Sequence, residues 1–595
     1  MDRNLILAIA LSMGVLLMWD LLIAGPQREE FQKTQQAVQE AAQEEQGDIS
    51  GLEGLDPGDA PLTLEEALAK APGRVVIKTP SLEGSINLQG GRIDDLELTQ
   101  YHEELDRESA NIRLLTPRDA EHGHYVEQGW VAGDKPGDKA VWSVADGAVL
   151  TPETPVTLIR EQDGLSYEKK ISVDEQYMFT IEQTVRNATA ETQSLTPYAL
   201  VIQRGKPDDL RNFMILHEGP LGIIGDRLFE RKYDKLRKNK NKEVNEAGVG
   251  GWLGITNKYW LAAAIPPQDE EMKASLSNIG DETSPIFRAF YSLSARELAP
   301  GAKLTLTSNV FGGVKDVDVL RSYEALPEDG GLGVHDFDKA VDWGHLFFLT
   351  RPIFYTLNFF GDLIGNFGVA ILILTLIIKG LLFPIANKGY ESMSKMKKLQ
   401  PEIEKLKSRF GDDKMKMQQE MMALYKKEKM NPLAGCVPIL FQMPIFYALY
   451  KTLFVTIEMR HEPFILWIKD LSAPDPTTIF NLFGLLPYDP TALPVLGAFL
   501  GIGVLPLLMG VAMWFQTKLN PPPADPVQAQ IFGMMPFIFV FIFAPFAAGL
   551  VLYWFWNTAL SILQQWVIMK KNGVTIDWGE RLKLPGRGKT PAPGE

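Results

Sequence analysis

The segment Phe367-Gly-Val-Ala-Ile-Leu-Ile-Leu-Thr-Leu-Ile-Ile-Lys-Gly-Leu-Leu-Phe-Pro384 decides the fold class of this chain. It is apolar over a length that approaches a membrane span, and it contains one lysine, Lys379. A basic segment with regularly spaced methionines follows from Lys388 to Met430, and a second apolar run extends from Asn431 to Tyr450. Two apolar runs joined by a basic hairpin predict a membrane protein whose hairpin lies in the cytoplasm.

The composition indicates more than one domain and excludes a disulfide framework. The chain has 595 residues and a formal net charge of −15, with acidic residues concentrated in its first half. A single soluble core rarely reaches this length, so we expect at least two domains. The one cysteine, Cys436, excludes an intrachain disulfide and a cysteine-based zinc site. His122 and His124 form the closest histidine pair, and we expect neither a metal site nor a cofactor.

The N-terminal residues predict a membrane anchor followed by a linker. Leu5 to Ile23 is nearly all apolar, is long for the core of a signal peptide, and is followed by no A-x-A cleavage site. We therefore expect an uncleaved transmembrane anchor over residues 1–24 with a cytoplasmic N-terminus. Residues 25–74 are rich in Gln, Glu, Ala, Gly and Pro, which is typical of a flexible linker.

Residues 75–320 consist of short alternating runs separated by turn signals. Examples of such runs are Val75–Thr79, Tyr177–Ile181 and Trp260–Ile265, and Gln162-Asp-Gly164 is one of the turns. Many short strands at this spacing predict an antiparallel β-sandwich. We see no nucleophile motif or convincing carboxylate pair, so we expect a binding or scaffolding domain. The basic run Arg231–Lys240 is interpreted as a solvated loop rather than a binding site.

The remaining segments complete a predicted topology of six spans. Aromatic and polar residues alternate over 336–362, which favours an amphipathic segment at the outer interface, and Pro352 is expected to break any continuous helix there. After the anchor, the predicted spans are 363–387, 431–457, 495–518, 531–545 and 546–569. Between them we place a cytoplasmic hairpin over 388–430, a periplasmic loop over 458–494, a short cytoplasmic loop over 519–530 and a basic cytoplasmic tail over 570–595. The loop from Ile479 to Pro494 is expected to dip into the interface. This arrangement follows the positive-inside rule.

Lys379 is the strongest candidate for a functional residue. A lysine near the middle of a span costs about 2.5–3.5 kcal/mol on insertion scales unless it snorkels or meets water. Thr375 lies one helical turn earlier on the same face. Further polar residues lie inside other spans: Gln442, Asn557, Ser561 and Gln565. Polar residues in three spans favour a shared hydrophilic pocket, with a snorkelling lysine and ordinary interhelical hydrogen bonds as the alternatives.

The basic segment divides at Gly411-Asp-Asp413 into two predicted antiparallel helices. On both sides, apolar residues that include methionines recur every three or four positions, which predicts a soft apolar face and a basic outer face. Such a hairpin either packs on itself or contacts apolar clients and anionic partners, such as lipid headgroups or ribosomal RNA. The candidate contact residues are Lys395, Met396, Lys397, Lys398, Met417 and Met421.

Several motifs resemble the YidC family of bacterial membrane protein insertases. They include Asn431-Pro-Leu-Ala-Gly-Cys-Val-Pro438, Phe441-Gln-Met-Pro-Ile-Phe446, Gln419-Glu-Met-Met-Ala-Leu-Tyr425 and Gly549-Leu-Val-Leu-Tyr553, and the resemblance covers the whole chain. It implies a multi-pass α-helical membrane protein of six spans, with a five-helix insertase core and a cytoplasmic helical hairpin. It also implies a large periplasmic β-sandwich of the supersandwich type and a location in the bacterial inner membrane.

The resemblance further implies a hydrophilic groove, open to the cytoplasm and to lipid, in which one basic residue receives polar parts of a client. Lys379 matches that residue, and Thr375 and Gln442 match neighbouring positions. The family usually has arginine there, so bidentate recognition of a carboxylate is lost while the charge remains. Trp554 stands where the family commonly has tyrosine. The implied partners are nascent membrane proteins, the Sec translocon, membrane lipids, and the ribosome through the hairpin and tail. We expect no DNA binding and no enzymatic reaction.

Two other classes of function stay open from the residues themselves. In a solute transporter or channel, Lys379 would bind a small anion, but such proteins usually have internal repeats and we see none. A membrane-bound carbohydrate enzyme that uses the outer domain is the weaker alternative. No nucleotide-binding motif is visible, so hydrophobic burial and the membrane potential would have to drive insertion.

Overall fold

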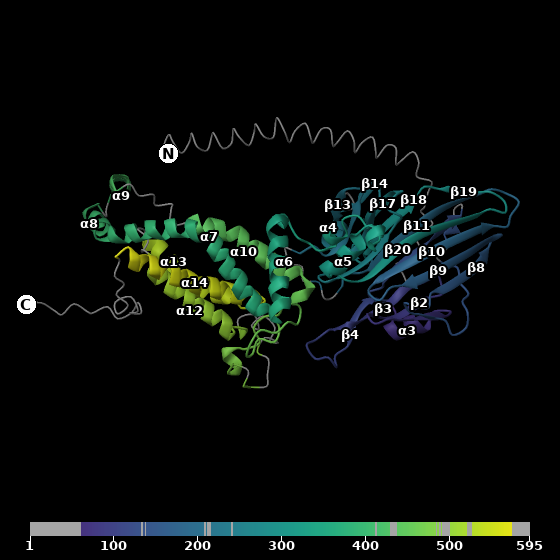
Figure 1. Cartoon of the computed structure of the whole chain (residues 1–595), viewed down its shortest axis with the longest axis horizontal. Coiled ribbons are helices and arrows are strands. Elements are labelled where there is room, and N and C mark those ends of the chain that lie inside the picture. The colour runs from purple at the N-terminus through teal and green to yellow at the C-terminus, as the bar shows by residue number, and fades with distance from the viewer. Residues whose placement is uncertain are drawn as a thin grey trace, which may run out of the picture. The chain divides into compact units, whose positions relative to one another are not determined.

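The computed structural model describes residues 61–132, 135–136, 139–207, 210, 216–239, 242–410, 413–428, 437–483, 485–486, 490, 500–520 and 526–573 (Figure 1). They belong to two compact units, divided in the sequence between Ala340 and Val341. The predicted N-terminal anchor, most of the linker, the Asn431–Cys436 motif and most of the basic tail lie outside the described residues.

Two β-sheets build the first unit. The 12-stranded sheet runs in the order β14-β17-β18-β11-β5-β3-β2-β1-β7, with β4, β6 and β19 attached to it, and the 8-stranded sheet runs β13-β12-β15-β16-β20-β10-β9-β8. The strands are β1 Arg74–Lys78, β2 Leu82–Asn87, β3 Arg92–His102, β4 Asn111–Leu115, β5 His124–Ala132, β6 Lys135–Pro136, β7 Val149–Leu150, β8 Val156–Gln162, β9 Leu165–Val173, β10 Met178–Asn187, β11 Gln193–Arg204, β12 Gly219–Ile224, β13 Arg227–Glu230, β14 Val244–Val249, β15 Gly251–Thr256, β16 Trp260–Ile265, β17 Glu271–Asn278, β18 Ile286–Leu293, β19 Arg296–Leu298 and β20 Lys303–Val314. The predicted β-sandwich is confirmed.

Period-two alternation sets the face that β8, β9 and β10 of the smaller sheet bury, whereas β12, β15 and β16 are buried along their whole length. In β9, the side chains at alternate positions from Leu165 to Val173 are buried, and β9 pairs antiparallel with β8 and β10. One of these inward positions holds a charged residue, Lys169. The expected strands at Val75–Thr79, Tyr177–Ile181 and Trp260–Ile265 correspond to β1, β10 and β16.

Short helices complete the first unit. They are α3 Leu64–Ala69, α4 Tyr233–Lys238 and α5 Val317–Glu324, with 3-10 turns at Pro327–Asp329 and Phe337–Ala340. The helix α4 lies within the basic run that the sequence analysis interprets as a loop, and that interpretation was wrong. Tyr233 and Leu236 are buried, so one face of α4 packs into the interior of the unit. The other face carries the lysines.

The second unit is helical. Its helices are α6 Phe347–Ile364, α7 Phe367–Lys398, α8 Gln400–Phe410, α9 Lys414–Lys427, α10 Val437–Val455, α12 Val504–Leu519, α13 Pro526–Phe543 and α14 Ala548–Lys571, with 3-10 turns at Ile457–Met459 and Ile479–Asn481. The helix α14 packs against α7 and α12, and α6 packs against α7 and α10. Among the described residues, α7 alone is long and apolar enough to cross a membrane by itself. Shorter apolar helical stretches cover Leu440–Val455, Val504–Leu519 and Ala529–Phe543, so the count of six spans stays a prediction.

The expected helix break at Pro352 was wrong, and another helix begins earlier than the predicted span. Pro352 lies inside the continuous helix α6, where its missing amide removes a single backbone hydrogen bond and the buried residues Ile353, Phe354 and Leu357 hold the helix in place. The helix α13 begins at Pro526 rather than Ile531, because a proline at the first helical position gives up an amide that would have no partner.

The hairpin also differs from the expectation. The helix α7 continues through Pro384 to Lys398, so Met393 and Met396 belong to this extension of α7. The hairpin itself consists of the shorter helices α8 and α9, which contact each other (Figure 1). The predicted apolar face is therefore divided among three helices, and its methionines lie on α7 and α9.

Candidate functional site

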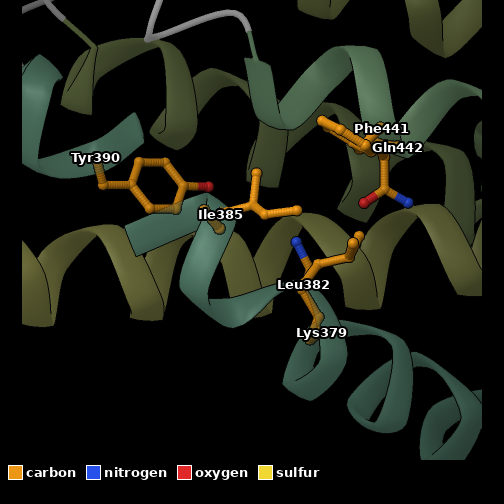
Figure 2. Close-up of a pocket in the computed structure, with 7 residues that line it drawn as sticks. Lys379, Leu382, Ile385, Tyr390, Phe441 and Gln442 are labelled. Carbon is orange, nitrogen blue, oxygen red and sulfur yellow. The ribbon is translucent and has the colours of Figure 1, made fainter. Parts of the chain in front are cut away.

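A small pocket, partly open to its surroundings, lies between α7 and α10. Its lining residues are Lys379, Leu382, Ile385, Ala386, Tyr390, Phe441 and Gln442. The residues from α7 follow helical spacing, which places Lys379, Leu382, Ala386 and Tyr390 on one face of that helix. Figure 2 shows the amine of Lys379 and the amide of Gln442 directed toward the same space, with the hydroxyl of Tyr390 turned toward it.

The ammonium of Lys379 binds a hydroxyl of α14. Its Nζ donates a hydrogen bond of 2.6 Å to Oγ of Ser561. The Ser561 hydroxyl donates in turn to the backbone carbonyl of Asn557, at 2.7 Å. Because the serine proton is used on that carbonyl, its oxygen is left to accept from the lysine. The side chain of Tyr390 also interacts with Ser561.

The opposite wall of the pocket is polar but uncharged. Nε2 of Gln442 donates to the hydroxyl of Tyr553, which is buried on α14 and so fixes the orientation of the amide. Within the described part of the chain, no carboxylate forms an ion pair with Lys379, which is half-buried. A cation held only by neutral groups can bind an additional anion or a carbonyl oxygen.

The structure brings some of the predicted site residues together. Lys379 and Gln442 line the pocket, Ser561 binds Lys379, and Asn557 supports Ser561 through its backbone carbonyl. This group comes from three helices, α7, α10 and α14.

Three other predicted residues have different surroundings. Thr375 is buried, and its hydroxyl donates to the Ile371 carbonyl of its own helix at 2.6 Å. Trp554 lies among aromatic rings, with its ring centroid 4.6 Å from that of Phe446. Gln565 is buried and donates to Oδ1 of Asn520, just beyond the end of α12, at 3.0 Å. Trp554 and Gln565 contact α10 and the end of α12, whereas the Thr375 hydroxyl bonds within α7, and none of the three lines the pocket.

Sequence reasoning missed two tyrosines of the site, Tyr390 and Tyr553. A signal for each was present in the helical spacing. Tyr390 lies three turns after Lys379 on the same face of α7, and Tyr553 lies one turn before Asn557 at the start of the polar stripe of α14. Tyrosines in apolar helices are easily interpreted as packing residues, so their hydroxyl groups were overlooked.

The predicted hairpin contacts divide into exposed and buried residues. Lys395 and Lys398 are exposed, and Met396, Met417 and Met421 are half-buried. Lys397 is only 7% exposed, and its Nζ donates to the backbone carbonyl of Leu519 at 3.2 Å. The prediction that Lys397 contacts a client or the ribosome was therefore wrong, because its side chain points inward against the end of α12. On α9, Met415 and Met422 are the exposed methionines.

Residues that could hold a metal are few in the described part of the chain. Nδ1 of His124 lies 2.8 Å from the carbonyl of Ile202, and burial lowers the pKa of His124 to about 4, as expected of a core histidine. Glu324, Asp336 and Asp338 have carboxylate oxygens within 4.8 Å of one another. Asp336 is already paired with Nζ of Lys339 at 2.5 Å, so this acidic group has a cation of its own.

Comparison with known proteins covers both units. The family model for the YidC periplasmic domain matches residues 74–356, and that for the 60Kd inner membrane protein matches residues 359–574. The membrane protein insertase YidC of Beijerinckia indica is 46% identical over 606 residues, which cover 99% of each chain. That of Rhizobium etli is 46% identical over 607 residues, again with 99% of each chain covered. This chain belongs to the YidC family of membrane protein insertases.

Membership in the YidC family confirms the resemblance seen in the sequence motifs. It makes the chain a membrane protein with a periplasmic β-sandwich domain, which implies the inner membrane. The relatives are named for insertion and not for an enzymatic reaction, as expected. A crystal structure described as an active YidC insertase with the first transmembrane domain resolved aligns with 83% of this chain and 92% of its own, at 18% identity and a TM-score of 0.36. The family assignment rests on the sequence matches, which are much stronger.

Proposed function

We propose that this protein inserts nascent membrane proteins by receiving the polar or acidic part of a client in the Lys379 pocket. The observation that carries the proposal is the state of this lysine. It lies in a pocket among apolar helices, and its ammonium is held by the neutral hydroxyl of Ser561 rather than by a carboxylate in the described residues. A client carboxylate could therefore bind it without displacing a charged partner.

Electrostatics favour this step. At about 4 Å from the ammonium, a client carboxylate would gain about 4 kcal/mol at an effective dielectric constant of about 20. The amide of Gln442 and the hydroxyl of Tyr390 offer further hydrogen bonds to backbone groups of the client. The pocket thereby lowers the cost of moving a polar segment part of the way across the membrane.

The apolar part of the client then leaves sideways into lipid. Phe441, which lines the pocket, and its chain neighbour Leu440 are exposed, so this side of the pocket is apolar. Each methylene that moves from water into hydrocarbon gains about 0.8 kcal/mol. Because a typical apolar segment carries many methylenes, lateral release supplies most of the driving force.

The proposed topology has both termini in the cytoplasm and six spans. The lysines at the end of α7 and the basic tail support it, because basic loops stay inside. In this arrangement, the exposed Lys395 and Lys398, the α8–α9 hairpin and the tail can contact ribosomal RNA. The Sec translocon is a further proposed partner.

The test is protease protection of a short, acid-tailed, single-span client synthesised beside proteoliposomes that contain the full-length protein. Lys379→Ala should lower the protected fraction strongly because it removes the charge. Lys379→Arg should retain it, since arginine keeps the charge and adds donors. A client whose acidic residues are replaced by asparagine should depend much less on Lys379.

The matched control is Lys303→Ala, which removes an exposed lysine of β20 in the other unit. It should leave protection unchanged. Equal protection with the wild type, Lys379→Ala and Lys379→Arg would contradict the role of the pocket. Protection no better than with empty liposomes would contradict insertion itself.

A further inference from the structure

The loop between α10 and α12 exposes the side chains that a soluble protein would bury. Leu485 is 83% exposed and Leu466 is 80% exposed. Further exposed apolar residues of this loop are Ile465, Phe480, Leu482 and Phe483. Apolar surface this concentrated marks an interaction site rather than scattered surface hydrophobics.

Two acidic residues of the same loop point inward. Asp470 is buried, and its Oδ1 accepts from the backbone amides of Ser472 at 2.7 Å and His461 at 3.2 Å. Asp475 is buried as well, and its Oδ2 accepts from the amide of Leu505 at 2.7 Å. In the described part of the loop, Lys469 is the charged residue that stays exposed. The loop thus satisfies its backbone with internal carboxylates and presents an apolar surface.

The backbone is strained where the apolar side chains point outward. Leu466, Leu482 and Phe483 have φ angles of 56°, 51° and 60°. Large side chains rarely adopt this left-handed region, and such strain persists only where the surroundings hold it. The exposed groups of these three residues are all apolar, so contact with water would not offset their backbone strain.

The position of the loop indicates what covers it. The amide of Ala548 donates to the carbonyl of Ala473 at 2.7 Å, which fixes the loop to the start of α14. It therefore lies at the end of the helical unit away from α8 and α9 (Figure 1). Leu508 and Val511 of α12, the helix that follows the loop, are exposed apolar residues as well. In a membrane protein, exposed apolar side chains of this kind face lipid.

We propose that this loop is a lipid anchor, which seats the periplasmic end of the helical unit in the interfacial layer of the outer leaflet. Its apolar side chains reach the acyl chains, while the inward carboxylates satisfy its irregular backbone, as a bilayer interface requires. Lys469 remains at the headgroups. A client segment is the rival occupant, but in the described part of the loop Lys469 is the one fully exposed polar residue with which to select a client. The proposal is independent of the Lys379 pocket.

The test uses the full-length protein with Cys436→Ser as the background, reconstituted into phosphatidylethanolamine and phosphatidylglycerol vesicles. A fluorophore sensitive to polarity is attached to Leu466→Cys or Leu485→Cys, and to Lys469→Cys as the matched control. Nitroxide groups on the lipid acyl chains should remove most of the emission at the two leucine positions and little at the lysine position. Phe483→Cys replaces either leucine variant if that variant does not fold.

Equal quenching at the leucine and lysine positions, or strong quenching at the leucine positions by iodide in the water, would overturn the proposal. Quenching by nitroxide lipids that disappears when an apolar client peptide is added would also overturn it, in favour of a client-docking surface. Each variant should unfold at the wild-type temperature in detergent, because the substituted side chains are exposed.

Discussion

Two lysines of the helical unit are satisfied in opposite ways. Lys451 of α10 is only 1% exposed, and its Nζ lies 2.5 Å from a carboxylate oxygen of Asp342, in the segment before α6. Lys379 of α7 lines an open pocket and binds the neutral hydroxyl of Ser561. The comparison indicates that a lysine fixed by an acid serves the fold, whereas a lysine held by neutral groups remains available to a ligand.

The largest effect should come from breaking the structural pair. Lys451→Met leaves Asp342 without its main partner, so the midpoint of detergent-induced unfolding of the purified full chain should fall. The expected loss is about 3–5 kcal/mol, as for other buried ion pairs that lose one member. The double variant Asp342→Asn, Lys451→Met should recover most of it. Equal losses in the single and double variants would show that the pair is unimportant.

The next prediction compares two lysines near the end of α7. Lys397→Met leaves the Leu519 carbonyl at the end of α12 without this donor, and should cost about 1–3 kcal/mol in the same unfolding assay. Lys395→Met alters an exposed side chain and should change stability by less than about 0.5 kcal/mol. If both variants lost the same stability, the contact with Leu519 would carry no weight.

Lys169 of the β-sandwich differs from both of these lysines, because backbone carbonyls hold its amine. The pH dependence of stability tests the effect of this difference. Lys169 is buried, and its Nζ donates to the carbonyls of Gln128 at 2.8 Å and Gly91 at 3.4 Å. Burial lowers the pKa of Lys169 from 10.5 to about 7, with Glu127 opposing the shift and Arg160 and Arg92 adding to it. The unfolded chain therefore binds a proton that the folded unit lacks between these two pH values.

Stability of the sandwich should accordingly be lowest below pH 7 and rise above it. The slope from this one group is at most about 1.4 kcal/mol per pH unit. Urea unfolding of the full chain, followed by tryptophan fluorescence, would measure it, and Lys169→Met should remove this part of the slope. An identical slope in the wild type and the variant would show that Lys169 does not titrate in this range.

The smallest effect on stability is expected at the pocket itself. Lys379→Met removes a charge that has no acidic partner among the described residues, so stability should change by less than about 0.5 kcal/mol or increase. Insertion of an acid-tailed client should nevertheless fall. Ser561→Ala keeps the charge and serves as the matched control, with insertion reduced less than by Lys379→Met. A large loss of stability in Lys379→Met would place this lysine with Lys451 as a structural residue.

Local patterns predicted much of the fold. Short apolar runs bounded by turn signals located β1, β10 and β16, because a strand of a sandwich buries apolar side chains and ends where a turn begins. Proline predicted the ends of helices less reliably than apolar runs predicted strands. Pro352 and Pro384 both lie inside helices, since burial of neighbouring side chains can offset one missing backbone hydrogen bond.

Part of the candidate site was also predicted from local sequence patterns. Lys379, Gln442 and the stripe of Asn557 and Ser561 were visible as polar positions in apolar segments. Trp554 and Gln565 belong to the same helix as Ser561, yet one packs among aromatic rings and the other binds Asn520. Which face of α14 meets α7 or α12 depends on how the helices pack, and spacing along one helix does not contain that information.

The sequence by itself determined that an apolar helix carries a lysine, that a basic hairpin follows it, and that a β-sandwich precedes it. These features are local, because they follow from periodicity and from the cost of placing charge in an apolar segment. Only the tertiary structure decided that Lys379 binds Ser561, a residue 182 positions away, while Lys397 is buried and Lys395 is not. The physical reason is that the partner of a polar side chain is set by the rotation and packing of whole helices, which bring together residues with no fixed separation in the chain.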